Sequence, residues 1–187
     1  MNPVSHIGPR LRLRELQQED TDAVFAIYGS DRATTHLSFE PRTHDQVRGI
    51  VQRATKNSQE TPRTEYGLAV VDLRQELIGF GRLAHDPHQP RAATVGFALR
   101  PSVWGRGYGL ETVNLLLGLA FEELGLHRVW GARAPENTAS ARTMAAAGMV
   151  EEGIIREHVN KKGRWRDSVV HGMLEREWQA RRSALQS

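Results

Sequence analysis

The stretch best suited to chemistry is a glycine-rich turn at residues 105–109, which reads Gly-Arg-Gly-Tyr-Gly. Glycines at alternate positions let the backbone approach a ligand closely and let successive N–H groups converge on one point. A helix is predicted directly after the turn, and its N-terminus adds the positive end of its dipole. This arrangement suits a phosphate or a pyrophosphate. A tight strand-to-helix connection that needs only small residues has the same spacing, so the residues alone leave both interpretations open.

Two familiar phosphate-binding motifs do not fit this turn. The dinucleotide fingerprint G-x-G-x-x-G would require glycine at position 110, where Leu110 stands. The nucleoside triphosphate loop G-x-x-x-x-G-K-[ST] does not occur in the sequence. An anion bound here would therefore belong to another carrier of a pyrophosphate.

The elements beside the turn form a strand–turn–helix unit. Residues 92–99 read as a short apolar strand that ends at Arg100-Pro101, because proline removes a donor from the strand ladder. After the turn, apolar residues recur at spacings of three and four, which predicts an amphipathic helix closed by Gly125. These residues are Leu110, Val113, Leu117, Ala120, Phe121 and Leu124.

The remainder of the chain predicts a mixed α+β fold. Thr43 and Gln46 match a capping box, and Gly79 and Gly81 suggest a bulge within a strand. Short connections favour antiparallel pairing, so we expect a mostly antiparallel sheet of about seven strands flanked by about four helices. Strands are expected at 10–15, 66–72, 76–83, 92–99, 128–134, 149–159 and 164–175, and helices at 21–28, 43–54, 110–124 and 137–147. Residues 36–42 are irregular and suited to lining a pocket.

Length and composition predict one cytoplasmic domain over residues 1–187, with a core at about 10–178 and a disordered tail at 179–187. An apolar fraction of 39%, a mean hydropathy of -0.50 and the lack of an 18-residue apolar run argue against a membrane span. No signal peptide is recognised in the first residues. The absence of cysteine excludes disulfides and a thiol nucleophile.

Charge and histidine spacing exclude further classes. The net charge is +3, and the basic residues are 22 arginines and three lysines. This small positive surplus favours an anionic cofactor, but it is too small and too evenly spread along the chain to indicate nucleic-acid binding. His85 and His88 invite a metal interpretation, but Pro87 lies between them and a third ligand is lacking nearby, so no metal site is expected.

Two motifs at their observed separation resemble the acyl-CoA N-acyltransferases of the GNAT superfamily. The first is the Trp-Gly-Arg-Gly-Tyr-Gly of residues 104–109, and the second is the Glu-Asn-Thr-Ala-Ser-Ala-Arg of residues 136–142, whose helix ends in Ala-Gly-Met at 147–149. Within that superfamily the chain resembles the branch typified by the ribosomal-protein alanine and serine N-acetyltransferases. The resemblance runs from the Leu-Arg-Leu-Arg of residues 11–14 to the Glu-Trp of residues 177–178.

The resemblance implies a splayed sheet with acetyl-CoA as co-substrate between the central strand and the next one. The pyrophosphate would bind the N–H groups of Arg106, Gly107, Tyr108, Gly109 and Leu110, and the pantetheine arm would pair with the backbone of Phe97, Ala98 and Leu99. Asn137 would contact the pantetheine or the nucleotide, or serve as an N-cap. Arg106 or Arg142 would reach a phosphate.

The implied reaction is direct attack of a primary amine on the thioester. Many relatives carry a tyrosine after the helix that ends at Gly148, and this chain does not. By the same resemblance Ser140 is the catalytic candidate, as a hydrogen-bond donor to the departing sulfur, and first-turn capping is its alternative role. The strand glutamate of some relatives is replaced by Thr94, and Glu111 is the nearest acid to the turn, so the general base stays unassigned.

The acceptor is not encoded in any motif. By resemblance it is a protein N-terminus or a small amine, chosen by residues 36–42 and the last hairpin. A homodimer is one option for the assembly. A non-catalytic acyl-CoA-binding or regulatory protein is the alternative function, and an RNA-associated role would rest on the basic residues 161–166 alone.

Overall fold

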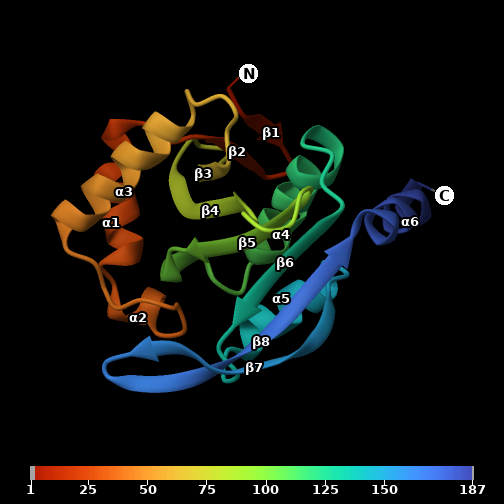
Figure 1. Ribbon diagram of the computed structural model, residues 1–187. Coiled ribbons are helices and arrows are strands. Elements are labelled where there is room, and N and C mark those ends of the chain that lie inside the picture. Colours follow the sequence, from red (N-terminus) through yellow and green to blue (C-terminus); the bar gives the residue numbers. More distant parts are fainter. Residues whose placement is uncertain (1–2, 187) are drawn as a thin grey trace.

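The computed structural model describes residues 3–186 and is built on one eight-stranded sheet (Figure 1). The strand order is β1-β2-β3-β4-β5-β6-β8-β7. Neighbouring strands are antiparallel except β5 and β6, which are parallel. The strands are β1 (Ser5–Ile7), β2 (Leu11–Glu15), β3 (Glu65–Asp72), β4 (Leu77–His85), β5 (Ala92–Leu99), β6 (Arg128–Arg133), β7 (Val150–Lys161) and β8 (Arg164–Leu174).

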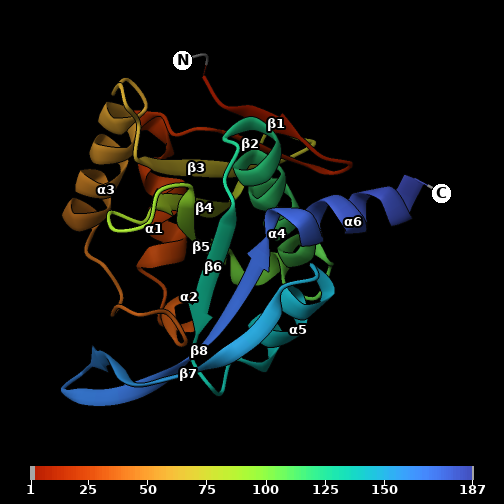
Figure 2. The ribbon, with the colours of Figure 1, turned by 45° about the vertical axis from the view of Figure 1, so that its right-hand side comes forward.

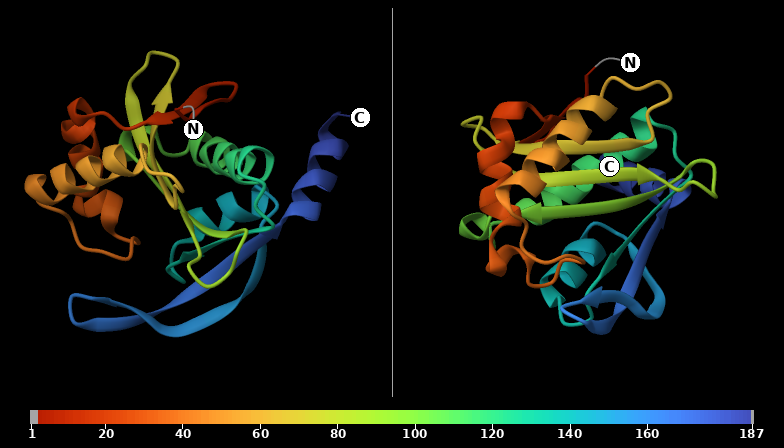
Figure 3. Two further views of the ribbon diagram at one scale, coloured as in Figure 1. Left: turned by 45° about the horizontal axis from the view of Figure 1, so that its top comes forward. Right: turned by 60° about the vertical axis from the view of Figure 1, so that its left-hand side comes forward.

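Helices cover both faces of the sheet, as the left panel of Figure 3 shows. α1 and α3 lie on one face and α4 and α5 on the other, while α6 leads away from the body after β8 (Figure 2). Side chains of β5 alternate between the two faces of the sheet and so contribute to both hydrophobic cores. Ala93 and Leu99 join the core under α4, whereas Ala98 joins the core under α1 and α3. The helices are α1 (Thr21–Tyr28), α2 (Asp31–Thr34), α3 (His44–Asn57), α4 (Tyr108–Gly118), α5 (Thr138–Ala146) and α6 (Glu175–Gln186).

The predicted fold class is confirmed, and so are several of its local signals. The central strand has the predicted bounds. At the start of α3, Thr43 Oγ1 accepts from Gln46 N at 3.3 Å and Gln46 Oε1 accepts from Thr43 N at 3.0 Å, which is the expected capping box. α4 continues as a π-helical turn, Leu119–Glu123, and Gly125 follows it with a φ of +60°.

The described residues contain eight strands and six α-helices, against the expected seven and four. β1 and α2 are too short, at three and four residues, to show a hydrophobic period. α6 forms where the polar tail was expected, because one residue anchors it. Trp178 is 6% exposed, stacks on Phe121 at 6.0 Å between centroids and donates its indole N–H to Glu122.

Membrane crossing by a helix is not supported in residues 3–186, where none of the helices combines the necessary length and apolar character.

Candidate active site

The glycine-rich turn ends in an open helix N-terminus. Gly105 and Gly107 have φ values of +75° and +78°, a left-handed conformation that glycine adopts without strain. α4 begins at Tyr108, and Glu111 N donates to Gly107 O at 3.2 Å as the first bond of the helix. The amides of residues 108–110 precede that bond and have no acceptor within the helix. The geometry therefore presents several N–H donors and a helix dipole to an anion.

Glu111, the acid nearest the turn, is committed to structure. Its side chain is 10% exposed, and it accepts from Arg10 N at 2.7 Å, Leu11 N at 2.8 Å and Arg10 Nε at 2.8 Å. These bonds fasten the start of β2 to α4. Both oxygens of Glu111 are thus taken up by donors from residues 10 and 11, so the side chain is not placed to reach a substrate amine.

The sheet opens between β5 and β6. The parallel ladder joins only Ala92–Thr94 to Arg128–Trp130, and beyond it the two strands diverge (Figure 1). Gly96 follows the last pair and is exposed, and no described atom lies within 4 Å of the position that a Cβ would take on it. The central strand therefore has an open edge beyond Thr94, and at Gly96 the face of the sheet is uncovered.

The register of β5 selects which main-chain groups face the gap. Asp86 N donates to Ala92 O and Arg100 N donates to Ile78 O, both at 2.8 Å, so the even-numbered residues of β5 direct their N–H and C=O groups toward β4. Ala98 is one of them and is turned away from the gap, contrary to the expectation from resemblance.

The odd-numbered residues of β5 face the gap instead. Of the expected residues, Phe97 and Leu99 remain. Val95 still lies against β6, since its O is 2.9 Å from the position that a Cβ would take on Gly131. The carbonyl of Leu99 already accepts from Trp104 Nε1 at 2.9 Å. Sequence reasoning chose three consecutive residues, but only every second residue of a strand directs its main-chain groups to one side.

The start of α5 lies beside the glycine-rich turn. Asn137 is its N-cap, with Oδ1 accepting from Ser140 N at 3.0 Å, so the capping role is filled. A Cβ on Gly109 would lie 3.5 Å from Thr143 Oγ1, which brings α4 and α5 together at this point. Thr143 lies one turn beyond Ser140 on the same side of the helix, and no sequence motif singled it out.

The two arginines expected to reach a phosphate are both on the surface. Arg106 is exposed within the turn. Arg142 is exposed on α5, and its guanidinium lies 3.4 Å from Thr138 O and 3.5 Å from Thr138 Oγ1.

On the opposite side of the sheet, the tip of the β7–β8 hairpin meets the irregular segment after α2. Lys161 Nζ donates to Thr34 O at 2.6 Å and to Thr35 O at 2.9 Å, and Arg166 Nη2 donates to Leu37 O at 3.3 Å. We call these contacts, with that of Lys162 N to Glu40 Oε1 at 3.1 Å, the hairpin latch. Lys161 and Arg166, two of the four basic residues in 161–166, thus donate to main-chain carbonyls of this segment.

A carboxylate lies near Gly96 on the face covered by α1 and α3. Arg82 on β4 is directly opposite Gly96, and Arg82 Nε donates to Glu65 Oε1 at 2.6 Å. Phe80 packs under α1 and α3, so Arg82, two residues further, stands on the same face. Glu65 is two strands from β5, roughly 10 Å across, and its side chain is 40% exposed.

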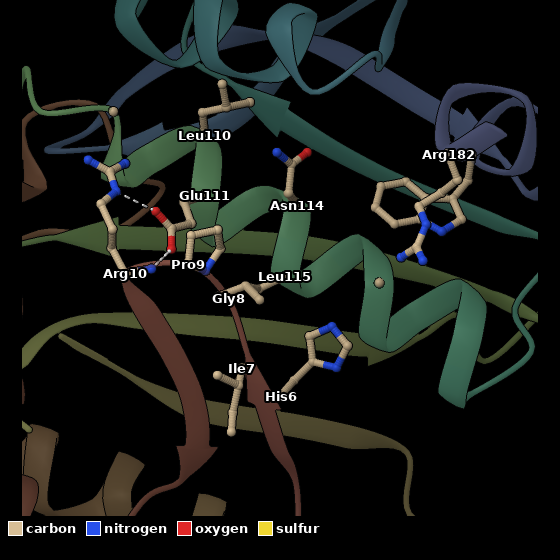
Figure 4. Close-up of a pocket in the computed structure, with 13 residues that line it drawn as sticks. His6, Ile7, Gly8, Pro9, Arg10, Leu110, Glu111, Asn114, Leu115 and Arg182 are labelled. Carbon is tan, nitrogen blue, oxygen red and sulfur yellow. Dashed lines mark hydrogen bonds and ion pairs between the residues drawn. The ribbon is translucent and has the colours of Figure 1, made fainter. Parts of the chain in front are cut away.

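A separate hollow of about 460 Å³ lies on the outer side of α4, between the N-terminal hairpin and α6 (Figure 4). Gly107 is the one residue of the turn 105–109 in its lining, and no residue of β5 lines it, so this hollow is distinct from the gap beside Gly96. Across the described part of the chain, His, Asp and Glu side chains do not gather in groups that could hold a metal ion.

Residues 10–150 match the acetyltransferase (GNAT) domain family. The uncharacterized N-acetyltransferase p20 of Bacillus licheniformis is 28% identical over 170 residues, which cover 90% of this chain and 95% of that protein. Spermidine N-acetyltransferase from Vibrio cholerae, solved with CoA and spermine, superposes with a TM-score of 0.80 at 22% identity over 92% of this chain and 99% of that one. Mycobacterium smegmatis RimJ, solved with CoA-disulfide, superposes with a TM-score of 0.81 at 21% identity, over 95% of this chain and 91% of that one. The chain belongs to the GNAT family of N-acetyltransferases.

Proposed function

We propose that this N-acetyltransferase moves the acetyl group of acetyl-CoA directly to a primary amine in a ternary complex. The observation that carries the proposal is the placement of two features along β5: the gap begins after Thr94, and the turn with its open amides follows Leu99. The pyrophosphate would bind the amides of residues 106–110. The pantetheine arm would run along Phe97 and Leu99, and the thioester would emerge beside Gly96.

The chemistry at Gly96 needs a proton acceptor and a donor to the developing oxyanion. An ammonium must lose its proton before attack, and Glu65 would accept that proton through a water molecule. The neutral amine nitrogen then bonds to the thioester carbon and the carbon–sulfur bond breaks. The surplus proton of the nitrogen passes to the departing thiolate, which leaves an amide and the free CoA thiol. A main-chain N–H of β5 would stabilise the oxyanion, and the Ser140 hydroxyl would donate to the departing thiolate.

The acceptor would approach on the face of α1 and α3, between the segment after α2 and the β7–β8 hairpin. Two neighbours by structure are named as a spermidine N-acetyltransferase and as RimJ, so a polyamine and a protein N-terminus are the acceptor types to test first. A cytoplasmic location and a homodimer remain predictions. β7 is an edge strand on which Ile154 is 62% exposed, and this surface is where we would seek the dimer contact.

Calorimetry with CoA, followed by release of the CoA thiol from acetyl-CoA, tests the proposal. The acceptor panel holds peptides with free N-termini, spermidine and small primary amines, and mass spectrometry identifies the acetylated product. We expect CoA binding and thiol release with at least one acceptor class. If CoA binds but no acceptor in the panel leads to thiol release, the acyl-CoA-binding alternative is favoured. If CoA does not bind, the assignment of the turn as the pyrophosphate site is wrong.

A further inference from the structure

We infer that Arg10 is a positioning residue for the acetyl donor, because it orients the amide of Gly107 toward the pyrophosphate. The inference rests on the proposed function. Arg10 precedes β2 and is far from the turn in sequence, yet its Nη1 donates to Arg106 O at 3.0 Å and its Nε donates to Glu111 Oε2 at 2.8 Å. Figure 4 shows the side chain reaching from the N-terminal hairpin to α4.

The bond to Arg106 O fixes the direction of the next amide. The peptide unit that joins Arg106 to Gly107 is planar and trans, so its C=O and N–H point in opposite directions. Arg10 holds the C=O toward β2, and the Gly107 N–H must then point away from β2. Gly107 O accepts from Glu111 N along the helix, and the same rule directs the Tyr108 N–H out of the helix N-terminus. Both amides are thereby turned outward.

The turn needs such an anchor because its own backbone is permissive. Glycines with positive φ stand on both sides of Arg106, and glycine reverses φ at little cost. Without a bond at Arg106 O, the intervening peptide unit is free to rotate, and ordering it would oppose ligand binding. A donor that is held before the ligand arrives avoids that entropic cost.

The guanidinium is itself fixed on three sides. It lies 4.7 Å from the centroid of the Tyr108 ring, and it is paired with Glu111, whose other oxygen accepts from the main chain at Arg10 and Leu11. The ion pair also offsets the positive charge of Arg10. Its effect on a bound anion is therefore exerted through the orientation of the turn more than through net charge.

The test compares Arg10→Met with Arg12→Met on two acetyl donors. Arg12 is the matched control, since it lies two residues further along, on β2, and its Nη2 donates to Gln75 Oε1 at 2.7 Å, away from the turn. Acetyl-CoA carries the pyrophosphate and S-acetylpantetheine lacks it. We expect Arg10→Met to weaken CoA binding and to raise the KM for acetyl-CoA by about tenfold or more, as for a lost hydrogen bond to a charged group. Its kcat/KM with S-acetylpantetheine, and every parameter of Arg12→Met, should stay near wild type.

Arg10→Lys separates orientation from folding. A lysine retains the charge beside Glu111 but lacks the planar fork that reaches Glu111 and Arg106 O together. We expect wild-type thermal stability with a CoA affinity between those of Arg10→Met and wild type. An equal loss of kcat/KM on acetyl-CoA and on S-acetylpantetheine would overturn the inference while leaving the proposed function intact. An unchanged CoA affinity in folded Arg10 variants would do the same. A wild-type protein that binds no CoA overturns the proposed function and the inference with it.

Discussion

The two ends of the candidate site are built in different ways. The proposed donor end takes its main-chain N–H groups from one continuous stretch, residues 97–111. The proposed acceptor end is assembled from residues 34–40 and 161–166, and the partners in its latch are 122 to 129 positions apart. Main-chain donors exist whatever side chain a position carries, whereas the latch depends on particular side chains. Substitutions at the acceptor end can therefore alter acceptor choice without altering donor binding.

The sharpest test of this division is Gly109→Val at the donor end. Its branched side chain would fill the space between Thr143 and the amides at the start of α4, where an added Cβ alone would lie 3.5 Å from Thr143 Oγ1. Loss of two charge-assisted bonds would cost roughly 3–6 kcal/mol, so we expect CoA affinity to fall about 100-fold or more by calorimetry.

Gly109→Ala is the control, because its single methyl makes only ordinary contacts. Its thermal stability and CoA affinity should stay closer to wild type than those of the valine variant. Unchanged CoA binding in Gly109→Val would remove the turn from the donor site.

Glu65→Gln tests the chemistry between the two ends. Glutamine can still accept from Arg82 but cannot accept a proton from the amine, so we expect turnover to fall roughly 100-fold with unchanged CoA affinity. The deficit should narrow as pH rises. Below its own pKa, an amine gains unprotonated fraction by roughly tenfold per pH unit and then needs the base less.

The surface carboxylate of Glu60, exposed just after α3, provides the matched control Glu60→Gln. It should match wild type at every pH. A Glu65→Gln profile parallel to wild type at every pH would exclude Glu65 as the proton acceptor and return the base to an unassigned state.

Ser140→Ala probes the exit of the thiolate. The main-chain N–H of residue 140 keeps its bond to Asn137, so the cap of α5 survives the substitution. We expect turnover to fall by about tenfold, the value of one hydrogen bond to a charged group, while the dissociation constant for CoA is unchanged. Wild-type turnover would leave Ser140 with a structural role.

The contrast between the two ends also explains what could be predicted from sequence. The fold class and the turn were predictable because their signals act over a few residues. These signals are the glycines at 105 and 107, the capping box at Thr43 and the spacing of apolar residues in α4. Arg10, Thr143 and Glu65 reach the site through tertiary contacts, and no local pattern reveals which segments the fold will join. Ala98 shows a further limit, because strand register decides which main-chain groups are free, and register depends on the partner strand.

The smallest expected effect belongs to Lys161→Met at the acceptor end. Burial lowers the pKa of the Lys161 ammonium, with Arg166 and Lys162 acting in the same direction, so this is not a freely solvated charge. Methionine keeps an unbranched side chain one atom shorter but removes the donors to the carbonyls at the end of α2 and after it. The remaining bonds from Arg166 still hold part of the latch. We expect the KM for the acceptor to rise about fivefold, near 1 kcal/mol, with CoA affinity unchanged.

Lys56→Met is the matched control for that variant, since Lys56 lies at the end of α3, away from the hairpin. If Lys161→Met weakened CoA binding as much as acceptor binding, the two ends of the site would be coupled through the sheet. The independence argued from their construction would then fail. If only the acceptor KM changes, and changes by different factors for a peptide and for spermidine, the hairpin latch contributes to acceptor selectivity.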